Sequence, residues 1–198
     1  MSIIIKNSSG GGITLDSSTT ANETLALPAG GGTLLKTDGD GSGLTGIVTG
    51  KVLQVVSTAD GVLATGTTTI PDNNTIPTST EGVQFLSRTI TPTDASNNLL
   101  IEVVFNYASS ANDTQTVALF KDTDAAAIAA SGIRDTSANV MMQLSITHHI
   151  VAGSISLQTF SVRSGNNGAG TTSFNGAAGL QIYGGVSASS ITITEYTP

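Results

Sequence analysis

The sequence predicts an all-β protein, and three observations lead to this fold class. Thr, Ser and Gly number 30, 23 and 23, so they supply 76 of the 198 residues; Thr favours strands, while Gly and Ser favour tight turns. Charged residues, which include most of the strong helix formers, are only 11% of the chain, compared with roughly 25% in an ordinary soluble domain. Segments that alternate apolar and polar residues are separated by turn-forming clusters at nearly every junction.

Residues 1–50 form the first predicted domain, which contains only short strands and glycine turns. A strand is expected at 2–6, followed by apolar triplets at 13–15, 25–27 and 33–35. So few apolar residues cannot offset the conformational entropy of folding within one chain. We therefore expect several copies to share one core as an intertwined trimeric stalk or anchor. Its predicted core residues are Ile13, Leu15, Leu25, Leu27, Leu34 and Leu35.

Residues 51–198 form the second predicted domain, in which the alternating segments are longer. Eight strands are expected, at 51–57, 83–91, 99–107, 116–121, 140–152, 157–163, 180–183 and 190–196. This number of strands without a convincing helix predicts an antiparallel, jelly-roll-like β-sandwich, called the knob below. The Ala-rich stretch 124–130 fits either one helical turn or a strand of small residues.

The composition excludes several functional classes. The chain has no Cys, so disulfide frameworks, thiolate nucleophiles and zinc fingers are excluded. Its formal net charge of −7, with only 7 basic residues, cannot neutralise a nucleic-acid backbone. No apolar run reaches the roughly 20 residues of a membrane span, and the first residues lack the features of a secretion signal. We expect a protein made in the cytoplasm that binds no nucleic acid and does not insert into a membrane.

The motifs that carry chemistry in other proteins are absent or incomplete. His148 and His149 are adjacent, so in a strand they point to opposite faces and cannot share a metal ion. Residues 38–43 resemble the start of a calcium loop, but Thr49 stands where that loop needs a bidentate Glu. No nucleophile lies in a G-x-S-x-G context, and no glycine cluster is followed by a phosphate-binding Lys. We expect no catalytic residue, metal or cofactor.

Two exposed loops are the predicted surface for binding a glycan or another protein. They are 106–114 and 165–175, which carry Asn, Ser and Asp, and the second includes the aromatic residue Phe174. The competing interpretation of each residue is a solvated turn.

The N-terminal residues carry a recognisable series of short motifs. Ser9–Asp16 contains an Ile-Thr-Leu strand, Asn22–Leu34 contains Thr-Leu-Ala-Leu-Pro followed by Gly-Thr-Leu, and a glycine-containing segment follows at Gly41–Ile47. This series is similar to a module common in bacteriophage fibre proteins, and the last segment resembles the short neck after it. Gly50–Val55 and Ile191–Tyr196 are similar to the start and end of distal β-domains of phage tail and head fibres. The resemblance implies a homotrimer whose N-terminal module attaches to other virion proteins while the knob projects outward. It assigns no receptor-binding residue.

The expected function is that of a phage virion structural protein rather than an enzyme. The trimer would be a short fibre whose knob adheres to a host-surface glycan or protein. Since barely 50 residues precede the knob, a head fibre or capsid decoration protein without a dedicated receptor is the main alternative. A glycan depolymerase would need paired carboxylates that the sequence does not reveal. A cellular lectin-like trimer is disfavoured by the missing secretion signal.

Overall fold

The computed structural model describes residues 3–6, 12–15 and 50–198, and the chain divides into two units, Met1–Ile47 and Val48–Pro198. In the first unit, strands β1 (Ile3–Lys6) and β2 (Gly12–Leu15) pair in antiparallel fashion. Ile13 and Leu15, two of the predicted trimer-core residues, belong to β2. The other four, Leu25, Leu27, Leu34 and Leu35, and the predicted strands that carry them lie outside the described residues, so the trimeric stalk stays a prediction.

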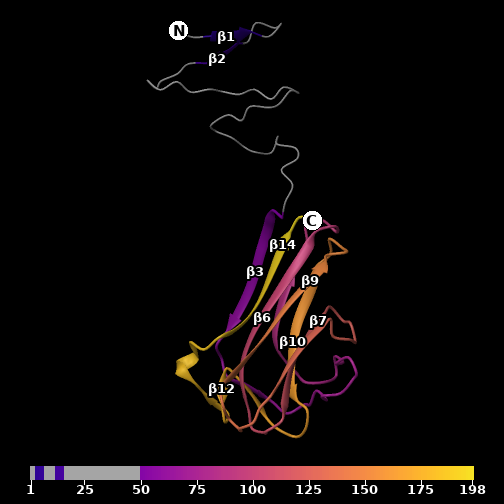
Figure 1. Ribbon diagram of the computed structural model, residues 1–198, viewed down its shortest axis with the longest axis vertical. Helices are drawn as coiled ribbons and strands as arrows, with labels where there is room; N and C mark the ends of the chain where they lie inside the picture. The colour runs from indigo at the N-terminus through magenta and orange to yellow at the C-terminus, as the bar shows by residue number, and fades with distance from the viewer. Residues whose placement is uncertain (1–2, 7–11, 16–49) are drawn as a thin grey trace. The chain divides into compact units, whose positions relative to one another are not determined.

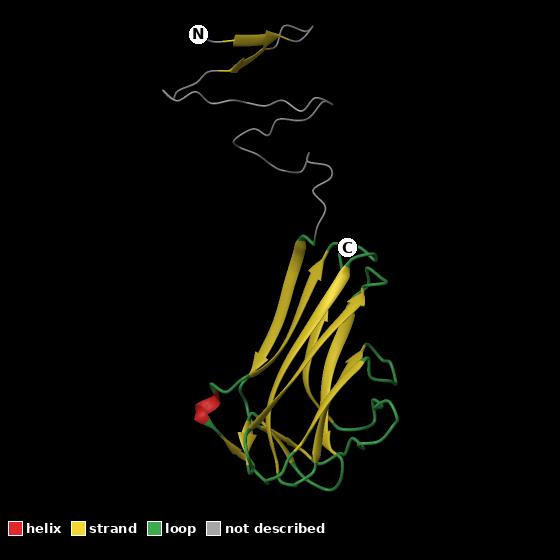
Figure 2. Ribbon diagram, viewed as in Figure 1, coloured by secondary structure: helices red, strands yellow, loops and turns green. Residues whose placement is uncertain are grey.

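The second unit consists of two antiparallel sheets (Figures 1 and 2). One sheet has the order β5 (Val83–Ile90), β10 (Gln158–Asn166), β7 (Thr114–Lys121) and β8 (Ala129–Arg134). The other has the order β3 (Val52–Asp60), β14 (Ser189–Tyr196) and β6 (Asn98–Ser109), with β9 (Met142–Val151) on the free side of β6.

Smaller elements complete the second unit. Strand β11 (Thr172–Phe174) pairs with the last residues of β6 and with β4 (Ala64–Gly66), which extends the second sheet. Strands β12 (Gly176–Ala177) and β13 (Leu180–Gln181) form a short separate pair, followed by a 3₁₀ turn at Tyr183–Gly185.

The connectivity confirms the predicted β-sandwich and its jelly-roll type. If the eight principal strands are numbered along the chain, one sheet has the order 1-8-3-6 and the other has the order 2-7-4-5. Successive strands therefore cross between the sheets, except β7 and β8, which pair within one sheet, as in a double Greek key. Seven of these strands are at predicted positions.

The remaining predicted strand, at 180–183, is wrong. Only Leu180 and Gln181 are extended there, and they pair with β12 outside the two main sheets. The remaining strand of the sandwich is instead β8, which begins at Ala129. The Ala-rich residues before it form the turn that leads from β7. Its small residues give β8 little hydrophobic pattern, and its pairing with β7 holds it in the sheet.

The core lies between the sheets and contains the inward-facing residues of both. Phe85 and Phe174 stack with ring centroids 5.1 Å apart, and Phe105 contacts both rings at 5.6 and 5.2 Å. Phe174 is only 1% exposed. The prediction that it belongs to an exposed binding loop is therefore wrong, because β11 turns its ring into the sandwich.

The two sheets differ in what covers their outer faces. Residues 67–82, between β4 and β5, cross the outer face of the sheet that contains β7. There, Ile70 packs with Ala118 and Phe120 in a second small core, and Ile70 and Phe120 are almost fully buried. The described residues contain no comparable covering segment over the outer face of the β3–β14–β6–β9 sheet.

The two ends of the sandwich carry different features. Gly50 and the C-terminus lie at one end, where the Thr197 amide donates to the Lys51 carbonyl oxygen at 3.1 Å (Figure 1). Since β3 and β6 run away from this end, the loops 61–63, 109–114, 135–141 and 167–171 lie at the opposite end, called the loop end below. No helix of the described residues is long and apolar enough to cross a membrane.

Candidate functional site

A polar groove runs beside the edge strand β8. It lies between β8 and the loop 71–77, and its larger section has a volume of about 550 Å³. A second section of about 410 Å³ shares Asn73, Thr75, Pro77 and Ala130 with the first, so the two are continuous. Because β8 pairs only with β7 in its sheet, backbone groups on its other edge are not used by the sheet.

The covering segment that builds one wall of the groove is fixed at both ends. Next to the sheet, the Ile70 amide donates to the Asn166 carbonyl at 2.9 Å. Gly165 allows this approach, because a side chain there would overlap the Thr68 carbonyl. Farther along, the Ala127 amide donates to the Pro77 carbonyl at 2.9 Å. The wall is therefore held on the protein before any ligand arrives, which reduces the entropy cost of binding.

The loop 71–77 takes its shape from its own polar side chains. Asn73 accepts the backbone amide of Thr75 at 2.8 Å, which forms an Asx turn. Asp72 accepts the Thr114 hydroxyl at 2.9 Å, and its own amide donates to the Asn167 side chain at 2.7 Å. One oxygen of the exposed Asp72 carboxylate is thus used for positioning, and the other is available to a ligand.

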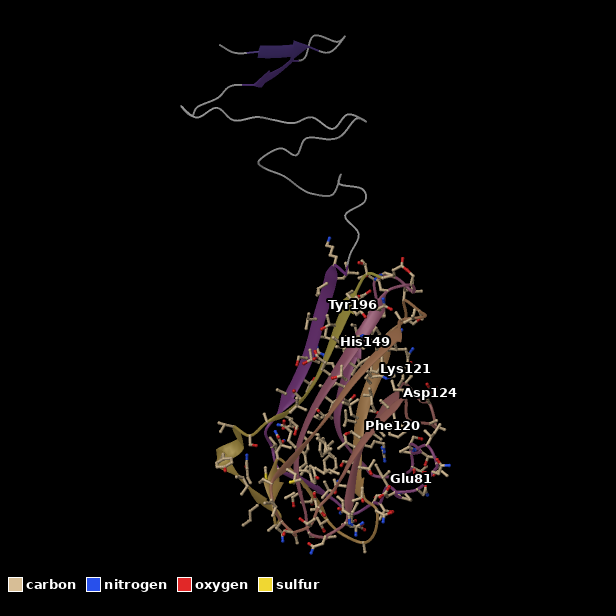
Figure 3. All side chains as sticks on the ribbon, in the orientation of Figure 1. Glu81, Phe120, Lys121, Asp124, His149 and Tyr196 are labelled. Atoms are coloured by element: carbon tan, nitrogen blue, oxygen red, sulfur yellow. The ribbon has the colours of Figure 1, made fainter. Side chains whose placement is uncertain are left out.

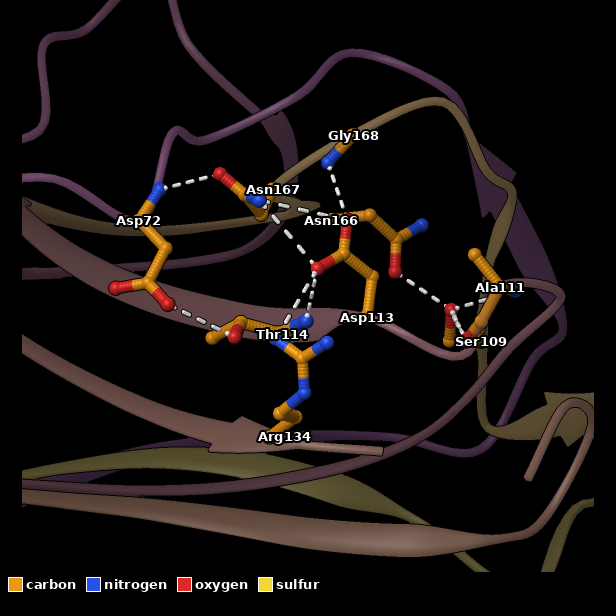
Figure 4. A network of polar contacts seen from close by, with 9 residues as sticks. All are labelled: Asp72, Ser109, Ala111, Asp113, Thr114, Arg134, Asn166, Asn167 and Gly168. Atoms are coloured by element: carbon orange, nitrogen blue, oxygen red, sulfur yellow. Dashed lines mark hydrogen bonds and ion pairs between the residues drawn. The ribbon is translucent and has the colours of Figure 1, made fainter. Parts of the chain in front are cut away.

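Asp113 organises the loop end next to the groove (Figure 4). Its carboxylate accepts backbone amides of Thr114 at 2.8 Å and Gly168 at 2.9 Å, and lies 4.0 Å from the Arg134 guanidinium. The hydrogen bond from the Thr114 amide is the largest cause that lowers the pKa of Asp113. Burial raises this pKa, while Asn167, Gly168 and Arg134 lower it further. These contacts use both carboxylate oxygens, so Asp113 is a structural anchor that joins two loops.

The Arg134 side chain is 70% exposed and also lines the groove. With Asp72, Asn73, Thr75 and Ser131, it gives the groove both hydrogen-bond donors and acceptors. Pro71, Pro77 and Ile133 supply apolar surface, and none of the described lining residues is aromatic. This mixture suits a ligand that carries many hydroxyl groups and some apolar C–H surface.

The predicted binding loops contribute to this site in part. From 106–114, only Thr114 lines the groove, and Tyr107 is fully buried. From 165–175, Asn167 positions the groove wall and Gly168 donates to Asp113, while Asn175 is buried and binds Ser189 and the Asp60 carbonyl. The principal wall of the groove, the loop 71–77, was not predicted from the sequence. A signal was present, since Asp-Asn-Asn stands between two prolines, which is typical of a structured turn.

The two histidines lie on β9, in the other sheet from β8, and neither lines the groove. His148 pairs with the inward-facing Ile101, and His149 pairs with Leu100 on the outer face. His149 Nδ1 lies 3.1 Å from the Tyr196 hydroxyl (Figure 3). Among the described residues, no group of three or more His, Asp or Glu side chains is arranged to hold a metal ion.

No protein-family model matches the sequence, and no curated protein matches it. The solved structures that resemble the chain include the C-terminal domain of EclA, a sugar-binding protein, at 15% identity and a TM-score of 0.29, over 68% of this chain and 81% of that one. They also include the VP2 subviral particle of infectious bursal disease virus, at 12% identity and a TM-score of 0.30, over 73% of this chain and 37% of that one. The Gt strain of that virus matches at 11% identity and a TM-score of 0.34, over 96% and 48%.

The chain spans less than half the length of these viral chains. All three likenesses have TM-scores of 0.34 or lower.

Proposed function

We propose that this chain is a structural protein of a phage particle. Three copies form a short fibre that attaches to other virion proteins through residues 1–50 and presents the knob to the host surface, where the groove beside β8 binds a glycan. Two features support the proposal: the sequence resemblance of residues 9–47 to fibre modules and the jelly-roll fold of the knob.

One observation carries the adhesive part of the proposal. The section of the groove that contains Asp72, Thr114 and Arg134 reaches the loop end, whereas Gly50 lies at the opposite end of the sandwich. A knob that is anchored through the segment before Gly50 therefore turns this part of the groove away from the anchor. Loops held on a rigid scaffold at such an end are the usual place for binding residues.

The charges of the groove indicate a neutral glycan. Asp72 contributes one negative charge, and Arg134 is balanced by Asp113 at 4.0 Å. The site is then net negative, on a chain whose formal net charge is −7, so a sialylated or phosphorylated glycan is repelled. Sugar hydroxyl groups can donate to Asp72 and accept from Asn73 and Arg134.

The number of carboxylates in the groove favours binding over catalysis. Glycoside hydrolysis ordinarily needs two carboxyl groups that flank the scissile bond. Asp72 is the one carboxylate among the described residues that line the groove. The neighbouring Asp113 has both oxygens engaged by donors.

The test is glycan binding by the full chain. Wild-type protein is applied to an array of neutral and anionic oligosaccharides, and the best ligand is then titrated by calorimetry. We expect binding to neutral glycans, and a dissociation constant about five- to thirtyfold higher for Asp72→Asn, since one hydrogen bond to a charged group contributes about 1–2 kcal/mol. Asp124→Asn, outside the groove and with the same change of charge, is the matched control.

Three results would contradict parts of the proposal. Equal affinity of Asp72→Asn and wild type excludes this groove. Absence of binding to any glycan, with the protein located on the capsid, favours the decoration function without a receptor. Release of reducing sugar from host polysaccharide shows an enzyme. Light scattering tests the trimer directly, with about three times 19.9 kDa expected.

A further inference from the structure

The outer face of the β3–β14–β6–β9 sheet differs from the other surfaces of the knob. Its strands are aligned by continuous pairing, from 190–196 against 98–104 and from 98–107 against 142–151. Since side chains alternate along each strand, this register places every second residue of β14, β6 and β9 on one surface, and β3 continues it apart from a register shift between Gln54 and Val52. We call this surface the open face.

The open face is nearly free of charge. Of its outward-facing residues, Glu102 is the single carboxylate, and the others are mainly Ser, Thr and Val. Exposed apolar residues stand at both edges: Val55 on β3 is 57% exposed and Val151 on β9 is 54% exposed. Between them, the half-buried Leu100 pairs with Thr194 on one side and His149 on the other.

The apolar end of this face is the end at which the N-terminal segment enters. Val52 begins β3 two residues after Gly50 and is paired with Tyr196. Tyr196 and His149 form an edge-to-face aromatic pair there, with ring centroids 6.5 Å apart (Figure 3). Aromatic residues with a polar group are enriched at protein interfaces. Copies joined through the 49 residues before Gly50 would therefore bring this part of the face together first.

We propose that the open face packs against a second copy of the same knob within the trimer. The inference rests on the proposed function, because it requires the N-terminal modules to associate. Charge favours a second copy as the occupant. A chain with 14 acidic and 7 basic residues repels itself at most surfaces, but a face with one carboxylate avoids that penalty. The covering segment 67–82 blocks the same contact on the opposite sheet.

The size of the open face explains why the N-terminal segments must associate for the knobs to pack. Four strands about 4.8 Å apart and seven residues with a rise of about 3.4 Å each give a footprint of roughly 450 Å². A standard interface buries roughly 800 Å² on each partner. The contact is therefore weak between separate knobs. It forms within the trimer because joined N-terminal segments hold the knobs at a high effective concentration.

Thiol labelling of the full chain tests the inference, because the natural sequence has no Cys. Val55→Cys places a thiol on the open face, and Val62→Cys places one on a loop away from it; both valines are mostly exposed in the single chain, at 57% and 67%. We expect the maleimide reaction of Val55→Cys to be at least tenfold slower in the assembled protein. Adding Val151→Glu to Val55→Cys should restore rapid labelling, while adding Val140→Glu should not.

The outcomes separate this inference from the proposed function. If light scattering gives a trimer but the two thiols react equally fast, the open face is not the contact, and the trimeric fibre stands. If the protein is a monomer at all concentrations, both fail. If Val55→Cys is protected in a monomer, the chain's own N-terminal segment covers the face, and the second copy is refuted.

Discussion

Glu195 provides a sharp test of how the knob is held together near Gly50. Its carboxylate, on β14, is fully buried and accepts hydrogen bonds from the side chains of Gln54, Thr93 and Asn97 and from the Thr93 amide. Strand β3 supplies Gln54, and the β5–β6 loop supplies the other donors. Replacing Glu195 by Gln removes the charge and turns an amide toward groups that are themselves donors.

The magnitude follows from the pKa of Glu195. Burial raises this pKa, but the hydrogen bonds from Gln54, Asn97 and Thr93 outweigh burial and lower it from 4.5 to about 2. Such a difference between the unfolded and folded chain corresponds to about 2–3 kcal/mol, after an allowance for solvent near this end of the sandwich. Because the folded pKa is the lower one, this stabilisation is present above pH 4.5 and is lost as the pH falls toward 2.

Urea unfolding of wild type and Glu195→Gln, followed by circular dichroism between pH 7 and pH 3, is the assay. We expect the variant to lose about 2–3 kcal/mol of unfolding free energy at pH 7. The gap should narrow between pH 5 and pH 3, because the wild type alone loses the contribution of an ionised Glu195. The control is Asp124→Asn, which removes an exposed carboxylate on the β7–β8 turn. This variant should retain the wild-type pH dependence of the unfolding free energy. Parallel pH curves for Glu195→Gln and wild type would refute the reasoning.

Three further substitutions test other parts of the structure. Burial raises the pKa of Asp135, and its Oδ2 has no partner among the described residues. Asp135→Asn should therefore raise the unfolding free energy by about 1 kcal/mol at pH 7. This gain should vanish at pH 3, where Asp135 is protonated in both the folded and the unfolded chain. Phe174→Ala should cost about 3–5 kcal/mol in urea unfolding, because it empties the aromatic core rather than a surface loop. Gly165→Ala should push the 68–70 backbone off the sheet, cost about 1–3 kcal/mol in thermal unfolding, and weaken glycan binding measured by calorimetry.

The fold class was predictable because most of the sandwich strands carry a complete local signal. In β6, Leu99, Ile101 and Val103 alternate with outward-facing residues, and each of the three is at most 1% exposed. A period of two with β-branched residues specifies both the strand and its buried face. The same holds for β14, where Ile191 and Ile193 are fully buried between Thr residues that face outward.

The remaining elements depend on contacts that local sequence does not encode. The residues of β8 include Ser131 and Gly132 and carry almost no hydrophobic period; β8 is a strand because β7 offers it a partner. Phe174 follows Ser and Thr in a segment that reads as a turn, yet its position is set by pairing with Tyr107 of β6. These are long-range effects that override local propensity.

The groove was hidden from sequence reasoning for a related reason. Asp72 and Arg134 are 62 positions apart in the sequence and meet only because residues 67–82 fold back over the sheet. Thr114 and Asn167, which hold Asp72 in place, come from two further loops. The composition of each loop predicts an exposed turn, but which loops share a site is decided by the order of the strands.

The jelly-roll connectivity also decides where a foreign segment can be attached. Lys51 and Thr197 are hydrogen-bonded to each other through the Lys51 amide and the Thr197 hydroxyl at 3.1 Å, so the end of β14 lies beside the start of β3. A peptide fused after Pro198 would therefore emerge next to Lys51, where the N-terminal segment enters the knob. The turn at 177–179, in which Ala178 and Gly179 have positive φ and a side chain at Gly179 would meet open space, lies instead near the loop end and is the better position for displaying cargo.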